Sequence, residues 1–171
     1  ARLTDGSTDQ LRHRYVRLDP DEEWIDASQP IHFSLFGIWS KRSGYARLDP
    51  GAGAVTPLVV EGKSITGLAK AKDAGVYAYT VQAFDDPPDV MVGGPGLRDA
   101  RAVARTNPFA GDYAWGTSEV IEYKNERGER LQGALFYPPG YQPGRKYPMV
   151  VYMYERLSDG VLEPKRWPLG R

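Results

Sequence analysis

Residues 147–155 read YPMVVYMYE, a short run of apolar and aromatic residues that is entered through Pro148. A continuous apolar run of this length, bounded by turn residues, is typical of a strand buried on both faces of an α/β sheet. Most of the chain before this run instead has the pattern of exposed antiparallel β-structure. The sequence therefore predicts that the chain leaves one architecture and begins a second, and that it is a segment of a larger protein.

Charge and composition narrow the possible functions. Lys plus Arg total 22 and Asp plus Glu total 22, a balance that gives no long-range attraction to nucleic acid or to an anionic membrane. The absence of cysteine excludes disulfides, thiolate metal sites and a cysteine nucleophile. With only His13 and His32 present, a histidine-built metal site is not expected, and no cofactor is predicted. These observations leave the cellular compartment open.

Short strand-like runs separated by turns fill residues 1 to 108. Strands are predicted at residues 31–36, 45–48, 55–60, 65–72, 76–83 and 90–92, while residues 97–105 fit either a short helix or a strand. Strands of roughly five residues with a turn about every ten are typical of a β-sandwich or a β-propeller. A propeller blade holds four strands in about 40–45 residues, so this region would supply roughly two to two and a half blades. Without a strict internal repeat, periodicity alone leaves both architectures open.

The pattern changes after a predicted connector at residues 106–113. Residues 119–124 and 130–138 form a predicted hairpin around the tight turn at 125–129, and a second loop at 139–144 leads into the apolar run. A hairpin followed by a central strand is a common entry into an α/β-hydrolase sheet.

Four segments of this second region resemble the prolyl oligopeptidase family of serine peptidases, most closely its dipeptidyl-peptidase and acylaminoacyl-peptidase branch. They are WGTSEV at 115–120, RGERLQG at 127–133, LFYPPGY at 135–141 and KYPMVV at 146–151. The resemblance implies a mainly β fold, with partial β-propeller blades followed by the first strands of an α/β-hydrolase domain. It assigns residues 1–108 to the C-terminal blades and residues 109–171 to a linker and the N-terminal strands of the catalytic domain.

The resemblance also implies chemistry that this chain cannot perform alone. The family transfers an acyl group to a serine on a G-x-S-x-G turn, with Asp and His following in chain order. No such motif occurs here, because Ser118 follows Gly116-Thr117 but precedes Glu119-Val120. The parent protein is thus expected to hydrolyse short peptides through an acyl-enzyme, and this segment is expected to be mainly structural and inactive by itself.

Tyr154 is the one residue that the resemblance places at the reaction. In the family a tyrosine just after the first long central strand helps to form the oxyanion hole, and Tyr154 lies six residues after Pro148. A phenol there would donate a hydrogen bond to the developing oxyanion. The alternative is an ordinary aromatic residue at a strand end. The sequence departs from the family's usual Gly or Pro after this tyrosine, because Glu155-Arg156-Leu157 follows.

The remaining polar residues are interpreted as structural. His13 is expected to be solvated, and His32 is expected on a strand surface because it alternates with its apolar neighbours. Solvated turns are predicted at 21–23 (DEE) and at 85–89 (DDPPD), and a loop at 93–96 (GGPG). The four tryptophans, which are Trp24, Trp39, Trp115 and Trp167, are expected to pack against sheets.

Three functional hypotheses remain open at this point. Besides the peptidase segment, the chain could be a free-standing β-sandwich that binds a ligand or a protein without catalysis, or a carbohydrate-binding module that uses its tryptophans. The expected partners of a peptidase segment are a peptide substrate and the remainder of the catalytic domain. Unpaired strand edges also predict that an isolated segment associates with itself.

Overall fold

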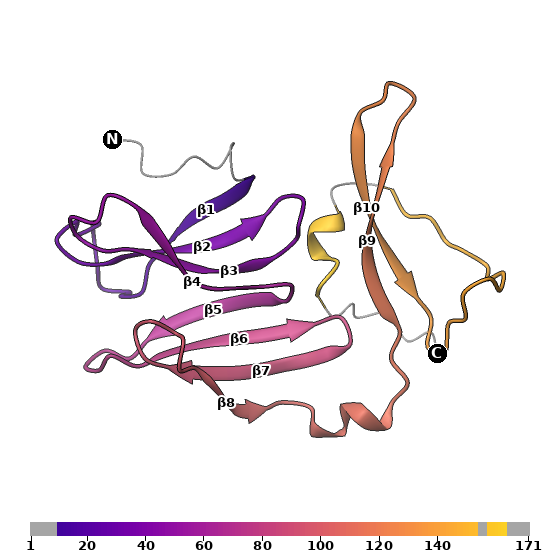
Figure 1. Ribbon diagram of the computed structural model, residues 1–171. Coiled ribbons are helices and arrows are strands. Elements are labelled where there is room, and N and C mark those ends of the chain that lie inside the picture. Colours follow the sequence, from indigo (N-terminus) through magenta and orange to yellow (C-terminus); the bar gives the residue numbers. More distant parts are fainter. Residues whose placement is uncertain (1–9, 154–156, 164–171) are drawn as a thin grey trace.

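The computed structural model describes residues 10–153 and 157–163. Over these residues the chain is mainly β, as predicted, with two short 3₁₀-helices and no α-helix (Figure 1). The strands are β1 Leu11–Val16, β2 Ile31–Gly37, β3 Ser43–Leu48, β4 Val55–Glu61, β5 Ser64–Lys70, β6 Tyr77–Ala83, β7 Asp86–Gly93, β8 Arg101–Arg105, β9 Thr117–Lys124 and β10 Arg130–Tyr137, and the 3₁₀-helices are η1 Pro108–Asp112 and η2 Leu157–Gly160. None of the described helices is long and apolar enough to cross a membrane.

Strands β1 to β4 form the first sheet, in which each strand pairs antiparallel with the next along the chain. At the centre, Ser34 of β2 lies opposite Arg14 on one side and Tyr45 on the other. The register shifts after Tyr45, so that its neighbour Ala46 lies opposite Pro57, and Pro57 therefore occupies an edge strand at an irregularity.

Strands β5 to β8 form the second sheet, again in chain order. The structure of this sheet differs from one prediction and decides another. Residues 86–89 begin β7 rather than forming a loop, because Pro87 and Pro88 stand at the start of the strand, where a missing N–H donor is tolerated. The ambiguous segment at 97–105 contains a strand, β8, rather than a helix.

The two four-stranded sheets stack face to face, and their shared core lies between them (Figure 1). Its buried side chains are Tyr45, Ile65, Leu68, Tyr77, Tyr79 and Leu97. The Tyr45 hydroxyl accepts a hydrogen bond of 2.9 Å from the backbone N–H of Leu68, which fastens β3 to β5. Each sheet follows chain order without a crossover, which is the order of propeller blades and differs from the Greek-key order of most sandwiches.

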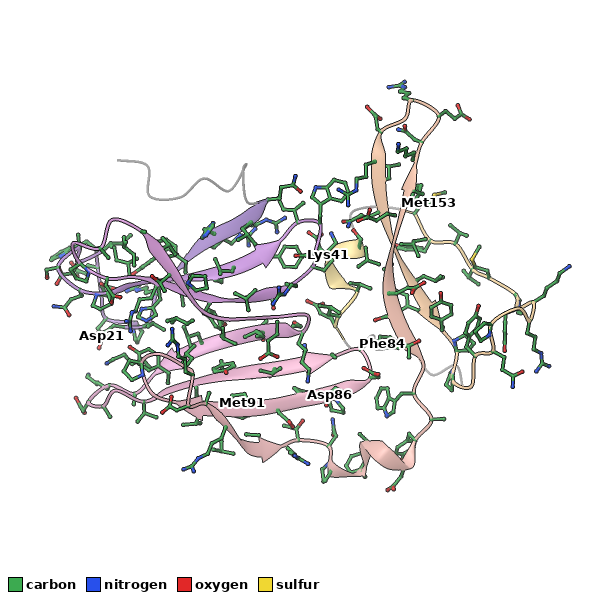
Figure 2. The ribbon with its side chains drawn as sticks, in the orientation of Figure 1. Asp21, Lys41, Phe84, Asp86, Met91 and Met153 are labelled. Atoms are coloured by element: carbon green, nitrogen blue, oxygen red, sulfur yellow. The ribbon has the colours of Figure 1, made fainter. Side chains whose placement is uncertain are left out.

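The predicted hairpin forms β9 and β10, with Arg130 opposite Lys124 at the turn end. It stands beside the ends of both sheets, where the Phe84 ring lies 5.2 Å from the Phe136 ring (Figure 2). The Gln132 side-chain amide donates a hydrogen bond of 2.7 Å to the Trp39 carbonyl of the β2–β3 turn. The hairpin therefore contacts the β2–β3 turn of the first sheet and the β6–β7 turn of the second.

The predicted buried strand at 147–155 is wrong over residues 147–153, which form no strand. The side chains from Met149 to Met153 are 64 to 95% exposed. A strand needs a neighbour to satisfy its N–H and C=O groups, and no described strand pairs with this segment. The described residues consequently show no strand of an α/β-hydrolase sheet, and β9 and β10 pair only with each other.

Candidate functional site

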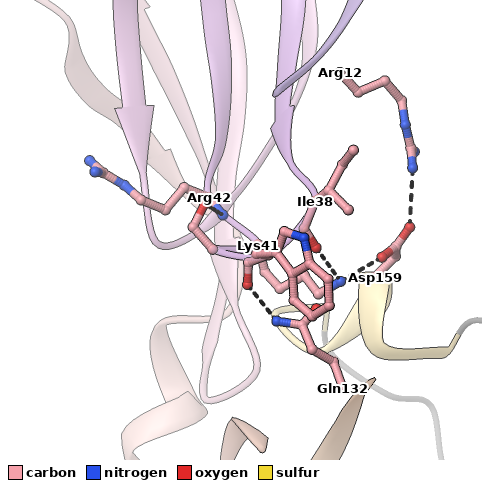
Figure 3. Close-up of polar contacts among 8 residues, drawn as sticks. Arg12, Ile38, Lys41, Arg42, Gln132 and Asp159 are labelled. Atoms are coloured by element: carbon pink, nitrogen blue, oxygen red, sulfur yellow. Dashed lines mark hydrogen bonds and ion pairs between the residues drawn. The ribbon is translucent and has the colours of Figure 1, made fainter. Parts of the chain in front are cut away.

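The best-formed polar site lies where the β2–β3 turn meets η2. Lys41 sits in this turn at a φ of 57°, and its side chain is 4% exposed. The ammonium nitrogen donates to the Ile38 carbonyl at 2.7 Å and to the Asp159 carboxylate at 2.8 Å (Figure 3). An ammonium group removed from water requires such partners. Lys41 and Asp159 therefore fasten two segments that lie 118 positions apart in the sequence.

A second cation shares the same carboxylate. The Arg12 guanidinium lies 3.5 Å from the second Asp159 oxygen, and it also lies 5.3 Å from the centre of the Phe36 ring. The Lys41 ammonium is 5.8 Å from that ring. Each distance is within the range of a cation–π contact. One carboxylate is thus shared by two cations gathered around one aromatic ring, and these three charged groups together carry one excess positive charge.

Hydrogen bonds from the hairpin complete this junction. The Ser118 hydroxyl of β9 donates to the Val161 carbonyl at 2.7 Å, and Val161 itself is fully buried. The Arg130 guanidinium of β10 lies 4.2 Å from the Trp39 ring centre, and it donates hydrogen bonds to both carboxylate oxygens of Glu122. That pairing lowers the pKa of Glu122. The junction, defined by Lys41, Asp159, Ser118, Val161 and Trp39, joins the first sheet, the hairpin and η2.

The junction lacks a hydrolytic site of its own. Ser118 uses its hydroxyl to hold Val161, and neither histidine bonds to a serine in the described part of the chain. Over the same residues, no group of three or more His, Cys, Asp or Glu side chains could hold a metal ion. Tyr154, the predicted oxyanion donor, and Trp167 lie outside the described residues. The described site can bind charge and fix geometry, but it offers no nucleophile with an adjacent base.

His32 differs from its predicted place on a strand surface. It is only 4% exposed and lies 5.6 Å from the Tyr77 ring, between the two sheets. Alternation along β2 was predicted correctly, but the face opposite Ile31 and Phe33 is covered by the second sheet. His13 is also partly covered, with its ring edge-on to Phe33 at 6.4 Å and its Nδ1 buried without a partner.

Burial lowers the pKa of His32, and the nearby Arg47 guanidinium lowers it further. The folded state then resists a proton that the unfolded state accepts, so stability rises with pH. We expect neutral His32 to contribute to the free energy of unfolding above about pH 6.5. This contribution should be lost as the pH falls towards the lower folded-state pKa of His32. The free energy of unfolding of the wild type minus that of His32→Phe, measured by urea titration at several pH values, should therefore rise with pH. A pH-independent difference would contradict it.

Other polar residues that the sequence placed in solvated turns have partners. Asp86 pairs with Lys63 at 2.8 Å, and this bond raises the pKa of the lysine. Glu22 accepts a 2.8 Å hydrogen bond from the Tyr15 hydroxyl. Trp24 is 74% exposed rather than packed on a sheet. These contacts are isolated pairs, and they do not form a second candidate functional site.

The comparisons with known proteins show a fold and no sequence family. No protein-family model matches the chain, and no curated protein matches it. Among solved structures, a variant of AtxE2 isopeptidase with Astexin3-dC4 bound aligns with a TM-score of 0.58 at 17% identity, over 86% of this chain and 27% of that chain. The unliganded AtxE2 isopeptidase aligns with a TM-score of 0.54 at 16% identity, over 72% of this chain and 19% of its own.

This likeness concerns architecture. The chain spans about a quarter of the length of the isopeptidase it matches, and its stacked four-stranded sheets resemble part of a β-propeller peptidase. The mainly β fold and the propeller-like blades predicted from the sequence are confirmed at this level.

Proposed function

We propose that this chain is the propeller-to-hydrolase segment of a serine peptidase related to the prolyl oligopeptidase family. The observation that carries the proposal is the order of elements, in which two chain-ordered sheets precede a hairpin that bears the WGTSEV and RGERLQG segments. A chain with this order aligns over 86% of its length with an isopeptidase. In this proposal residues 1–108 supply C-terminal blades. Residues 109–171 supply the linker and the first elements of the catalytic domain.

The segment's own role in this proposal is to hold the two parts together. Lys41 and Trp39 project from a blade turn, whereas Asp159 and Gln132 come from the region assigned to the catalytic side. The exposed apolar residues 149–153 provide a surface that a larger catalytic domain would cover, since patches of this kind mark interaction sites. The same surface supports the prediction that the isolated segment associates with itself.

The proposed reaction is hydrolysis of peptide bonds in short peptides through an acyl-enzyme. The serine, aspartate and histidine that perform it would come from other parts of the parent protein. Tyr154 remains the residue of this chain proposed to donate a hydrogen bond to the oxyanion. The similar structures are of an isopeptidase, which extends the candidate substrates to isopeptide bonds.

A fluorophosphonate probe tests the proposal, because it reacts covalently with activated serines. The product of the whole reading frame that contains this chain would be labelled, digested and mapped by mass spectrometry. We expect one labelled serine, located outside residues 1–171, and loss of labelling after heat denaturation.

The 171-residue chain alone is the matched control, and it should remain unlabelled although it contains Ser118. Absence of labelling in the whole product, or labelling of Ser118, would contradict the proposal. The first result would return the chain to the binding-module hypothesis, and the second would place an activated serine in the segment itself.

A further inference from the structure

A cavity of about 240 Å³ lies beside the Lys41–Asp159 pair. The first sheet lines it through β1 and β2, the second sheet lines it through β5, and residues 159–163 close one end. This volume is smaller than the roughly 300–1,000 Å³ of sites for drug-sized ligands, so it suits one or two side chains.

Cationic side chains outnumber carboxylates on the walls of this cavity. Arg12, Arg14 and Lys41 line it, against the carboxylates of Asp159 and Glu163. Asp159 is already shared by Lys41 and Arg12, at 2.8 and 3.5 Å. The Arg14 side chain has no acidic partner among the described residues. Within the described part of the chain, the β1 side of the cavity therefore offers a guanidinium group that has no acidic partner and could bind a further anion.

Neutral donors face the same space. Ser64 is 8% exposed, and its hydroxyl makes no hydrogen bond within the described part of the chain, although it lines the cavity. The hydroxyl of Thr66, two residues further along β5, also lines the cavity and also lacks a bond there. Thr66 is exposed, and among the described residues neither hydroxyl is both buried and unpaired, so each is open to donate to an acceptor that enters the cavity beside the arginines.

We infer that this cavity binds a carboxylate group of a peptide, with Arg14 and Arg12 as the cations and Ser64 and Thr66 as the neutral donors. Asp159 is a carboxylate of the chain itself, and Arg12, one of these two cations, already binds it together with Lys41. Planar guanidinium groups match carboxylates in geometry as well as in charge.

The open edge of β1, which lines the cavity, explains why the ligand is a peptide. In the described part of the chain β1 pairs only with β2, so its other edge presents free N–H and C=O groups. An extended peptide can add to such an edge, while its side chains are selected by adjacent pockets. Arg12 and Arg14 are two residues apart on this strand and therefore face the same side. This inference does not rest on the proposed function, because equilibrium binding requires no catalytic group.

Fluorescence polarisation with three labelled peptides tests the inference on the full chain. The first is capped at both ends and carries a central glutamate, the second replaces that residue with glutamine, and the third is neutral but has a free C-terminal carboxylate. We expect the glutamate peptide, the free-carboxylate peptide or both to bind about tenfold or more tightly than the glutamine peptide, because the bonds involved are charge-assisted. The two carboxylate peptides identify which source of the group the site prefers.

Two variants and a matched control locate the binding. Arg14→Gln and Ser64→Ala should each remove most of the preference for a carboxylate, with circular dichroism used to check folding. Arg101→Gln changes an exposed arginine on β8, in the other sheet, and should leave the preference unchanged. Equal binding of all three peptides, no binding of any, or a preference that survives Arg14→Gln would overturn the inference.

Discussion

Replacing Gly44 with alanine should lower the free energy of unfolding by about 3 kcal/mol or more, a large part of the roughly 5–15 kcal/mol available to a domain. A Cβ at this position would lie 1.8 Å from the Val59 carbonyl oxygen and 2.9 Å from the Val60 Cα. Both are backbone atoms of the neighbouring strand, so no rotamer change relieves the clash. Gly44 pairs with Leu35 on its other side, and the strand cannot move away without breaking that pairing too.

The matched control is Gly62→Ala, in the short connection between β4 and β5. A Cβ there meets nothing within 4 Å, and its φ is not in the left-handed region. This variant should stay within about 0.5 kcal/mol of the wild type. Urea unfolding of both variants, followed by tryptophan fluorescence and circular dichroism, measures the difference. A Gly44→Ala protein as stable as the control would mean that β3 and β4 are not packed at the register found here.

The strands could be predicted because their information is local. Alternation such as IHFSLF at 31–36, and turn residues such as those at 125–129, specify period and reversal within a few residues. Periodicity alone allowed either a sandwich or a propeller. In the structure each four-stranded sheet follows chain order, which favours blade-like sheets. That order depends on which strands pair with one another, and composition does not encode the pairing.

The failures share a cause, which is that a sequence pattern does not state what covers a residue. Residues 149–153 have the composition of a buried strand, yet they are exposed because no described strand lies beside them. His32 alternates as a surface residue should, yet the second sheet covers it. Lys41 reads as an ordinary turn residue, and its burial depends on Asp159, which is 118 positions away. No local signal in the sequence connects those two residues.

Replacing Asp159 with alanine should lower the free energy of unfolding by about 2–3 kcal/mol, because it leaves the charge of a buried lysine without its carboxylate. The expected loss lies below the roughly 3–5 kcal/mol typical of buried pairs, since the Asp159 side chain is 31% exposed and the Ile38 carbonyl still accepts from Lys41. Hydrogen exchange should also accelerate in β1 and in the β2–β3 turn, where Arg12 and Lys41 lose their shared partner.

The pair of Asp21 and Lys72 supplies the control for this variant. Its atoms are 3.7 Å apart and its side chains are 79 and 81% exposed, so Asp21→Ala should change stability by less than about 0.5 kcal/mol. A double-mutant cycle adds Lys41→Met, which removes the buried charge. If the ion pair causes the loss, Asp159→Ala should have little further effect in the Lys41→Met background. An Asp159→Ala loss of the same size in both backgrounds would show that η2 is held by contacts other than this pair, and the junction would then need a different physical basis.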